Sequence, residues 1–381
     1  MNSCPIYLDY NATTPCDPRV VDVMLPFFTT HFGNAASKSH AYGWYAEEAV
    51  ALAREQVAAL IGADPQEIIF TSGATESVNL AIRGFAEANG AKGNHIITVA
   101  TEHKAVLEVC EYLASIGFDL TVLPVDTDGM IYPHQVEAAM RPDTMLLASM
   151  YANNETGVVL PIPALGALAK ERGIAFFTDA TQAIGKIPVN VVADGIDLMA
   201  FSGHKLYGPK GVGCLYVRKK KPKVEISPLQ YGGGHERKMR SGTLNVPGIV
   251  GLGKAVEICQ QEMSGESVRL ASYRDQLVSA LTAKSTILPN ATAIQLLPHV
   301  ANLRFNFAGG DQLVRKLSKN LAISSGSACS SVSVVPSHVL KAMGLSDDEA
   351  LSSIRFSLGR FTTAAELEQA IHHVLDVCPL D

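Results

Sequence analysis

The fold class is decided by residues 174–205, which read IAFFTDATQAIGKIPVNVVADGIDLMAFSGHK. This stretch contains two short apolar runs, 174–177 and 198–201, in which polar and apolar residues do not alternate. Such runs are typical of parallel strands that are buried on both faces of a sheet. Each run leads into small or polar residues, with Asp179 after the first and Lys205 after the second. Because ligands bind at the carboxyl ends of strands in open α/β sheets, we expect these side chains to line a site.

Helices and further apolar strands alternate around this stretch, from about residue 45 to residue 255. Residues 47–60 carry apolar side chains at helical spacing, with Gly62 just past their end. Another helix is expected between Pro163 in its first turn and Gly173 at its end. Further short apolar runs cover residues 68–70, 96–99 and 145–148. This alternation predicts an α/β fold with a mainly parallel sheet covered on both faces.

The pattern changes after about residue 260. Apolar and polar side chains alternate over 303–307, which predicts a half-exposed strand. Two segments, 346–349 and 363–366, fit the capping box at the start of a helix. We therefore expect a smaller α+β domain, which a long helix over about 247–263 joins to the first.

The composition excludes several classes of protein. The chain has 381 residues, of which 47% are hydrophobic and 18% charged, so disorder of the whole chain is excluded. Its net charge of −6 argues against direct binding to nucleic acid. No signal peptide and no apolar run of membrane-spanning length is visible, so we expect no membrane partner. Seven scattered cysteines form no metal-binding pattern and no complete disulfide framework, which favours the cytoplasm and no metal site.

Nucleotide-binding motifs are incomplete or missing. Residues 248–254 read G-x-x-x-x-G-K, but Ala255 stands where a phosphate-binding loop needs serine or threonine for magnesium. The motif also follows Pro247 within an expected helix, so we interpret its glycines as helix packing. No G-x-G-x-x-G pattern follows a strand, which leaves dinucleotide binding without its signature.

Three features at the strand ends together point to one cofactor. Residues 71–77 form a small-residue turn before a helix, whose N–H groups would suit a phosphate, although a capped turn without ligand is an equal alternative. Asp179 alone is better explained as a helix cap, and Lys205 alone as a lysine in a surface turn. Together, a phosphate cradle, a carboxylate and an enclosed amine are what pyridoxal phosphate requires. Enclosure should lower the pKa of the lysine toward that of a usable amine.

A set of short motifs runs in order along the chain: 7–15 (YLDYNATTP), 33–34 (GN), 39–40 (SH), 71–77 (TSGATES), 101–103 (TEH), 153–157 (NNETG), 179–182 (DATQ), 202–211 (SGHKLYGPKG), 240–243 (RSGT) and 325–329 (SGSAC). Together these motifs closely resemble the cysteine desulfurases of the NifS/IscS type, in the class V aminotransferase family. The resemblance implies the fold-type I architecture of pyridoxal phosphate enzymes. It places a large cofactor-binding domain at 15–255 and a small α+β domain at 1–14 and 256–381. It also implies a homodimer with shared active sites.

The resemblance further assigns roles to single residues. Lys205 is implied to be the Schiff-base lysine, and His103 to stack on the cofactor ring and assist proton movements. Asp179 would contact the pyridine nitrogen and Gln182 the phenolic oxygen. The remaining implied contacts are Ala74, Thr75, Ser202 and His204 on the phosphate, Thr243 from the other subunit, and Asn154 and Arg355 on the substrate and its carboxylate.

Cys329 is the residue that distinguishes a cysteine desulfurase from a plain aminotransferase. It lies in the polar, small-residue segment 324–333, which is unlike a packed core. A free cysteine is more often a small buried hydrophobe than a nucleophile, and this setting reverses that expectation. The long segment from Cys329 to His338 resembles the IscS-like rather than the SufS-like group, which favours a mobile cysteine. The resemblance implies that L-cysteine is converted to L-alanine while its sulfur passes to Cys329 as a persulfide.

Other readings stay open. An aminotransferase or a selenocysteine lyase shares this fold, and Cys329 argues only against the first. A non-catalytic sulfur carrier would not need Lys205. Longer relatives carry a C-terminal tail that docks an iron–sulfur scaffold, whereas only residues 376–381 follow the last expected helix. The sulfur acceptor is therefore open between an iron–sulfur scaffold, a tRNA-thiolation protein and machinery that places sulfur in the DNA backbone.

Overall fold

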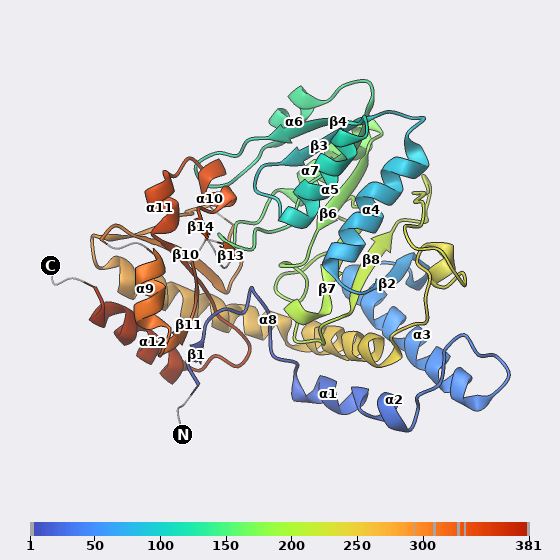
Figure 1. Ribbon diagram of the computed structural model, residues 1–381, viewed down its shortest axis with the longest axis horizontal. Coiled ribbons are helices and arrows are strands. Elements are labelled where there is room, and N and C mark those ends of the chain that lie inside the picture. The colour runs from blue at the N-terminus through green and yellow to red at the C-terminus, as the bar shows by residue number, and fades with distance from the viewer. Residues whose placement is uncertain (1–3, 294, 308–309, 326–327, 331–332, 379–381) are drawn as a thin grey trace.

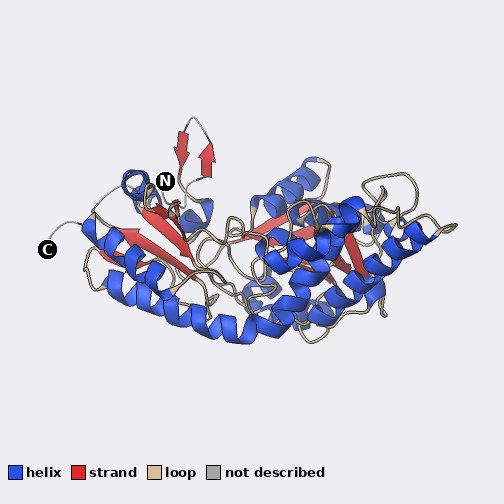
Figure 2. Ribbon diagram, turned by 90° about the horizontal axis from the view of Figure 1, so that it is seen from below, coloured by secondary structure: helices blue, strands red, loops and turns tan. Residues whose placement is uncertain are grey.

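A computed structural model describes residues 4–293, 295–307, 310–325, 328–330 and 333–378, with the backbone alone at 310–311, 328–330 and 333–334. Two β-sheets lie side by side, and the long helix α8 (Val246–Thr282) runs past both of them (Figures 1 and 2). The expected helix over 247–263 is therefore present but extends further than its sequence pattern indicated. The domain boundary that we expect at residue 255 falls inside α8 and stays a prediction.

The larger sheet has seven strands in the order β2-β8-β7-β6-β5-β3-β4. Strands β7, β6, β5, β3 and β4 pair in parallel, whereas β8 is antiparallel to both of its neighbours. The connection over 203–212 is shorter than the crossover of roughly a dozen residues that a parallel strand needs, so the chain turns back. The strands are β2 (Ile68–Thr71), β3 (His95–Val99), β4 (Asp119–Leu123), β5 (Thr144–Ala148), β6 (Ala175–Asp179), β7 (Leu198–Ser202) and β8 (Gly213–Val217). The predicted mainly parallel sheet is confirmed.

Helices cover both faces of this sheet, as predicted. Consecutive residues of β6 point into different cores, Phe176 into one and Phe177 into the other. The first core includes residues of α3, α6, α7 and α8, and the second includes residues of α4 and α5. The helices are α3 (Ala41–Ile61), α4 (Ala74–Asn89), α5 (Lys104–Ser115), α6 (Pro133–Ala139) and α7 (Ile162–Arg172). Helices α3 and α7 end at Gly62 and Gly173, as expected.

The smaller sheet has four antiparallel strands in the order β12-β15-β10-β9. They are β9 (Ile287–Pro289), β10 (Val300–Phe305), β12 (Ser324–Ser325) and β15 (Ser353–Ser357). Their core contains residues of α8, α9 (Gly310–Leu317) and α12 (Ala364–Asp376). The capping boxes at 346–349 and 363–366 open α11 (Asp347–Leu351) and α12.

The predicted half-exposed strand at 303–307 is present as β10, which ends at Phe305. Leu303 and Phe305 are buried, Arg304 is partly exposed and Asn306, just past the strand, is exposed. Within the strand, neighbouring segments contact the polar face. Asn302 is 5% exposed, and its Nδ2 donates to the backbone oxygen of Glu155 at 3.0 Å. Arg304 is paired with Glu349 of α11 at 2.5 Å. Alternation marks a strand with two chemically different faces, and here neighbouring segments satisfy the polar face.

Shorter elements complete the fold. Strand β1 (Ile6–Tyr7) pairs in parallel with β11 (Leu321–Ala322), so the N-terminal segment lies against the smaller sheet. Strands β13 (Ala328–Ser330) and β14 (Ser333–Val335) pair only with each other. The remaining helices are α1 (Pro18–Met24), α2 (Pro26–Thr29) and α10 (His338–Ala342). Within the described ranges, no helix combines the length and apolar character needed to span a membrane.

Candidate active site

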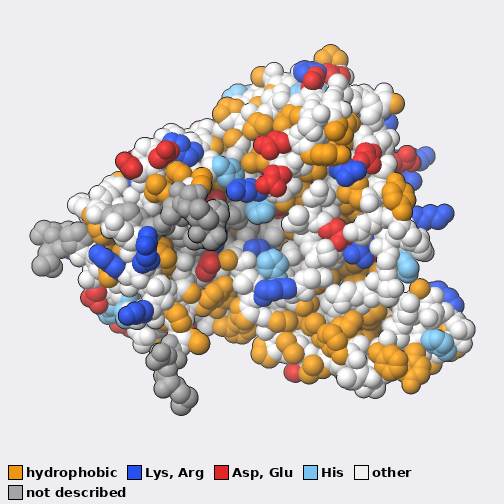
Figure 3. Space-filling model, viewed as in Figure 1, with side chains coloured by type: hydrophobic (Ala, Val, Ile, Leu, Met, Phe, Trp, Pro, Cys, Tyr) orange, Lys and Arg blue, Asp and Glu red, His pale blue; other side chains and the backbone are white. Residues whose placement is uncertain are grey.

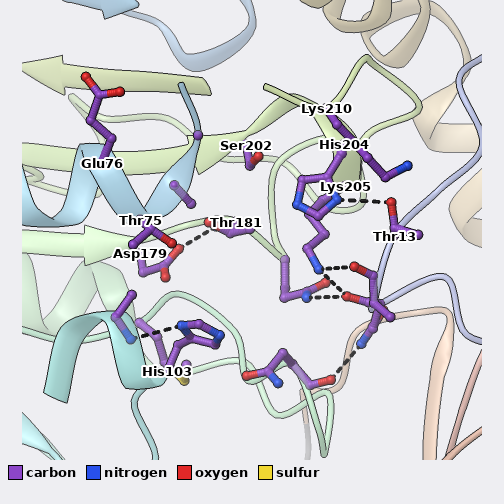
Figure 4. Close-up of a pocket in the computed structure, with 18 of the residues that line it drawn as sticks. Thr13, Thr75, Glu76, His103, Asp179, Thr181, Ser202, His204, Lys205 and Lys210 are labelled. Carbon is purple, nitrogen blue, oxygen red and sulfur yellow. Dashed lines mark hydrogen bonds between the residues drawn. The ribbon is translucent and has the colours of Figure 1, made fainter. Parts of the chain in front are cut away.

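A cavity of about 700 Å³ opens at the carboxyl ends of β6 and β7. Its walls come from residues 11–13, the first turns of α4 and α5, the two strand ends and Arg355 of β15. On the face shown in Figure 3, basic and histidine side chains gather around a hollow between the two halves of the molecule. Figure 4 shows His103, Asp179 and Lys205 projecting toward one space from three different elements. The site expected at the strand ends is therefore a cavity in which distant segments meet.

The first turn of α4 can hold an anion. Ala74 and Thr75 open the helix and line the cavity, and no side chain caps the N–H groups of this turn. Strand β8 lies against the turn so closely that a Cβ atom on Gly213 would be 2.6 Å from the Cα atom of Gly73. Ser202, buried at the end of β7, also lines this part of the cavity. Free N–H groups at the positive end of a helix dipole suit a phosphate.

Lys205 follows β7 in a tight turn and projects into the cavity. Its Nζ donates hydrogen bonds to the backbone oxygens of Asn11, at 2.5 Å, and Ala12, at 2.6 Å (Figure 4). Burial, together with the nearby guanidinium of Arg355, lowers the pKa of Lys205 to about 8. The predicted enclosed lysine with a lowered pKa is confirmed. About a tenth of the amine is therefore uncharged and nucleophilic at pH 7, far more than for a lysine with an ordinary pKa.

Two polar side chains from the end of β6 face the same cavity. Asp179 is 7% exposed, and its Oδ1 accepts a hydrogen bond from the backbone N–H of Thr181 at 2.9 Å. Gln182 donates from Nε2 to the backbone oxygen of Asn11 at 3.1 Å. Asp179 therefore stabilises the turn that follows it, as a capping residue would, and its carboxylate also faces the cavity.

Two histidines of the site are held in the neutral form. His103 precedes α5, and its Nδ1 accepts a hydrogen bond from the backbone N–H of Ala105 at 3.1 Å. Burial lowers the pKa of His103, and the Asp179 carboxylate opposes that shift. His204 lies 3.1 Å from the hydroxyl of Thr13 through Nδ1, and burial lowers its pKa to about 4. Burial therefore favours the uncharged form of both rings at neutral pH.

Arg355 and Asn154 meet at the opposite wall. Nη1 of Arg355 donates to the backbone oxygen of Asn154 at 2.9 Å, and both residues line the cavity. Nη2 of Arg355 donates to Oδ1 of Asp9 at 2.6 Å. A fixed guanidinium at the edge of a cavity suits the two oxygens of a carboxylate.

Two expected site residues do not line this cavity in the described structure. Thr243 lies on an exposed loop before α8. The backbone of Cys329 lies in β13, and its side chain is outside the described structure. The structure thus brings together the implied cofactor and substrate residues of one chain; it leaves Thr243 outside the cavity and does not describe the side chain of Cys329.

Sequence reasoning from the strand ends missed the N-terminal wall. Asn11 accepts hydrogen bonds from Lys205 and Gln182 at its backbone oxygen, and its Oδ1 lies 2.8 Å from Nε2 of the buried His299. Residues 7–15 carry no regular periodicity, so only the resemblance singled them out. Lys210, on the turn after Lys205, also lines the cavity and was not assigned a role.

Comparisons with known proteins agree with this site. The family model for class V aminotransferases matches residues 6–370. The cysteine desulfurase IscS of Anaeromyxobacter dehalogenans (strain 2CP-C) is 54% identical over 368 residues, which cover 96% of this chain and 91% of that protein. The IscS of Klebsiella pneumoniae (strain 342) is 52% identical over 372 residues, covering 97% and 92%.

A solved structure described as a NifS-like protein superposes with a TM-score of 0.91 at 37% identity, covering 98% of this chain and 99% of that one. That similarity in fold extends over both sheets. The likeness in sequence and in structure thus spans the cavity and the hairpin of Cys329 alike. The chain therefore belongs to the class V aminotransferase family and, within it, to the cysteine desulfurases of the NifS/IscS type.

Proposed function

We propose that this chain binds pyridoxal phosphate in the cavity, takes L-cysteine as substrate and passes its sulfur to Cys329 as a persulfide while L-alanine leaves. One observation carries the proposal: the Lys205 amine, with a pKa of about 8, shares a cavity with the Asp179 carboxylate and the uncapped first turn of α4. A reactive amine, a carboxylate and an anion site are the three groups that the cofactor needs.

The residues present fit pyridoxal phosphate. The phosphate would lie against the N–H groups of Ala74 and Thr75, with Ser202 and His204 beside it. Asp179 would keep the ring nitrogen protonated, and Gln182 would donate to the phenolic oxygen. When bound, this cofactor supplies an electron sink for electrons released at the substrate Cα.

The chain's own groups then handle protons and orientation. Arg355 and Asn154 would hold the substrate, Arg355 by its carboxylate. The neutral amine of Lys205 would take the proton from the substrate Cα, and His103 would assist proton movements. The Cys329 thiolate would attack the substrate sulfur, so that an S–S bond forms as the Cβ–S bond breaks. The electron pair of the broken bond would stay on Cβ, which takes up a proton and becomes the methyl group of L-alanine. The approach of Cys329 to the cavity is part of the proposal.

The test is a single-turnover experiment on the cofactor-loaded protein. Brief exposure to L-cysteine should release L-alanine and add one sulfur atom to the peptide that contains Cys329, as seen by mass spectrometry. Alanine release without any labelled cysteine would contradict the sulfur route, and no alanine release would contradict the activity. Parallel assays with L-selenocysteine decide whether a lyase activity exceeds the desulfurase activity.

We also propose a homodimer in which Thr243 completes the partner's phosphate site. Large apolar side chains are exposed on α1–α3, including Leu25 at 56%, Phe28 at 60% and Trp44 at 55%. Exposed apolar patches of this kind are typical of protein–protein contact sites. Mixed dimers of a Thr243→Leu chain and a Lys205→Ala chain should recover activity at limiting pyridoxal phosphate. No recovery in proven heterodimers would contradict shared sites.

The sulfur acceptor and the compartment complete the proposal. One solved neighbour, at 39% identity and a TM-score of 0.81, is described as SspA in complex with cysteine and covers 94% of this chain. An iron–sulfur scaffold or another protein of a thio-modification pathway would accept the sulfur in the cytoplasm, where thiols such as Cys110, Cys214 and Cys259 stay reduced. Feeding L-cysteine to a lysate and identifying the newly persulfidated proteins tests the acceptor.

A further inference from the structure

The guanidinium of Arg355 is fixed by two contacts, one to the cavity-lining residue Asn154 and one to Asp9, which does not line the cavity. Its side chain is 9% exposed, and it donates to the Asn154 backbone oxygen and to Oδ1 of Asp9. A guanidinium has five N–H donors, and these contacts use two of them. Nε has no partner within the described part of the chain. Arg355 is thus held firmly and keeps donor capacity for a further anion.

Asp9 reaches Arg355 from the N-terminal segment. This segment runs beside β15: the backbone N–H of Ser357 donates to the Leu8 oxygen at 2.8 Å, and that of Tyr10 donates to the Ser357 oxygen at 3.2 Å. The Asp9 backbone is fixed further by the hydroxyl of Tyr7, which donates to the Asp9 oxygen at 3.0 Å. Asp9 does not line the cavity, whereas Arg355 does. The Asp9 carboxylate therefore contacts the guanidinium of Arg355 without lining the cavity itself.

The charge of Asp9 also matters for the neighbouring amine. Arg355 lowers the pKa of Lys205, whereas Asp9 and Asp179 raise it. A buried guanidinium without a counter-charge would carry an uncompensated desolvation penalty. The ion pair therefore keeps a cation at the cavity wall without adding an unbalanced charge beside Lys205.

We propose that Asp9 is a positioning residue for recognition of the substrate carboxylate: it holds the Arg355 guanidinium in the orientation that the carboxylate binds, and it does not touch the substrate. This inference rests on the proposed role of Arg355. A purely structural ion pair is the competing explanation. The two differ in one respect, because a positioning role affects only ligands that carry a carboxylate.

The experiment compares L-alanine with ethylamine, which is alanine without its carboxylate. Binding of each to the cofactor-loaded protein is followed by the change in visible absorbance. Asp9→Ala should weaken binding of L-alanine by about tenfold, the loss expected for one hydrogen bond in a charged pair. Binding of ethylamine should change less than about twofold, because ethylamine has no carboxylate for Arg355 to hold. Asp9→Asn, which keeps an acceptor for Nη2, should lose less than Asp9→Ala.

Asp17→Ala is the matched control. Asp17 forms a comparable buried pair with Arg360 at 2.8 Å, and neither residue lines the cavity. This variant should leave the ratio of the two affinities unchanged. Unchanged or tighter binding of L-alanine by Asp9→Ala, or equal losses for both ligands, would overturn the inference. If Arg355→Gln itself leaves L-alanine binding unchanged, the assigned role of Arg355 fails, and the inference fails with it.

Discussion

The cavity and the hairpin of Cys329 are held in opposite ways. The cavity wall is tied together from distant segments, as when Asn11 accepts hydrogen bonds from both Lys205 and Gln182. Strands β13 and β14 form a two-stranded sheet of their own and stand away from the four-stranded sheet (Figure 2). Residues 337–338 at the start of α10, which we call the foot of the hairpin, contact residues next to the cavity wall: Ser337 donates to Glu155 at 2.5 Å, and His338 lies 2.9 Å from the backbone oxygen of Glu102.

This difference matches two tasks: the cavity orients the reactant, and the hairpin carries the cysteine that transfers sulfur. Groups that bind and orient a reactant need a geometry fixed by packing and hydrogen bonds from several directions. A group that accepts sulfur at one place and surrenders it at another has to reach both. An isolated two-stranded hairpin is of marginal stability by itself, which suits the second task. Glu102 and Glu155 flank His103 and Asn154 in sequence, so the foot of the hairpin is fixed next to the reacting groups.

The largest effect is expected for Lys205→Ala, a substitution in the cavity that removes the reactive amine but leaves the anion site of α4. Alanine release from L-cysteine should fall by more than about a thousandfold, because a proton acceptor at Cα is lost together with the covalent anchor. Pyridoxal phosphate should still co-elute with the protein in gel filtration. Lys220→Ala, on an exposed turn, is the control. Near-normal turnover by Lys205→Ala would remove Lys205 from the mechanism.

The corresponding substitution on the hairpin is Cys329→Ser. A hydroxyl is a far weaker nucleophile than a thiolate at neutral pH, so turnover should fall by about a hundredfold or more. The absorbance change of the bound cofactor on addition of L-cysteine should persist, because the cavity is untouched. Cys4→Ser, at an exposed cysteine, should behave as the unmodified protein. Loss of the absorbance change in Cys329→Ser would show that the two regions are not separable.

The lowered pKa of Lys205 predicts how cofactor uptake by the cavity depends on pH. Because its pKa is lowered to about 8, the amine is mostly protonated at pH 7 and mostly neutral at pH 9. The rate at which cofactor-free protein takes up pyridoxal phosphate should therefore rise about tenfold from pH 7 to pH 9 and then level off. A simple alkylamine with an ordinary pKa should continue to gain rate above pH 9. A profile for the protein that follows the alkylamine would contradict the enclosed amine.

The smallest effect is expected for Ser337, at the foot of the hairpin, on the rate of sulfur transfer. Ser337→Ala removes the hydrogen bond to Glu155 and the cap of α10, and Ser346→Ala removes only the cap of α11. Each should lower the free energy of unfolding by about 1 kcal/mol. Only Ser337→Ala should slow sulfur transfer to Cys329, by about fivefold, while the binding of L-alanine stays unchanged. Equal transfer rates in the two variants would mean that the foot contact does not position the hairpin.

The sequence predicted the parts of the site that periodic elements deliver. Apolar strands placed Asp179 and Lys205 at one edge of the sheet, and the lowered pKa of Lys205 followed from that placement. The N-terminal wall could not be found in this way, because the contacts of Asn11 join segments far apart in sequence and leave no local pattern. The alternation at 303–307 correctly indicated a partly exposed polar face, with Asn306 exposed. It could not show that Glu155 and Glu349, far away in sequence, contact Asn302 and Arg304.

The N-terminal wall also sets the order in which the site can be made. Asp9 and Arg355 form an ion pair across 346 positions of sequence, and Asn11 accepts the Lys205 amine across 194. On the ribosome, residues 7–15 emerge long before β11 and β15, the two strands against which this segment lies, have been synthesised. The large sheet can fold before then, whereas the cavity closes only after nearly the whole chain is available. The cavity wall is thereby completed only after β15 has been synthesised, and we expect a chain interrupted before residue 355 to form much of the large sheet without a complete site.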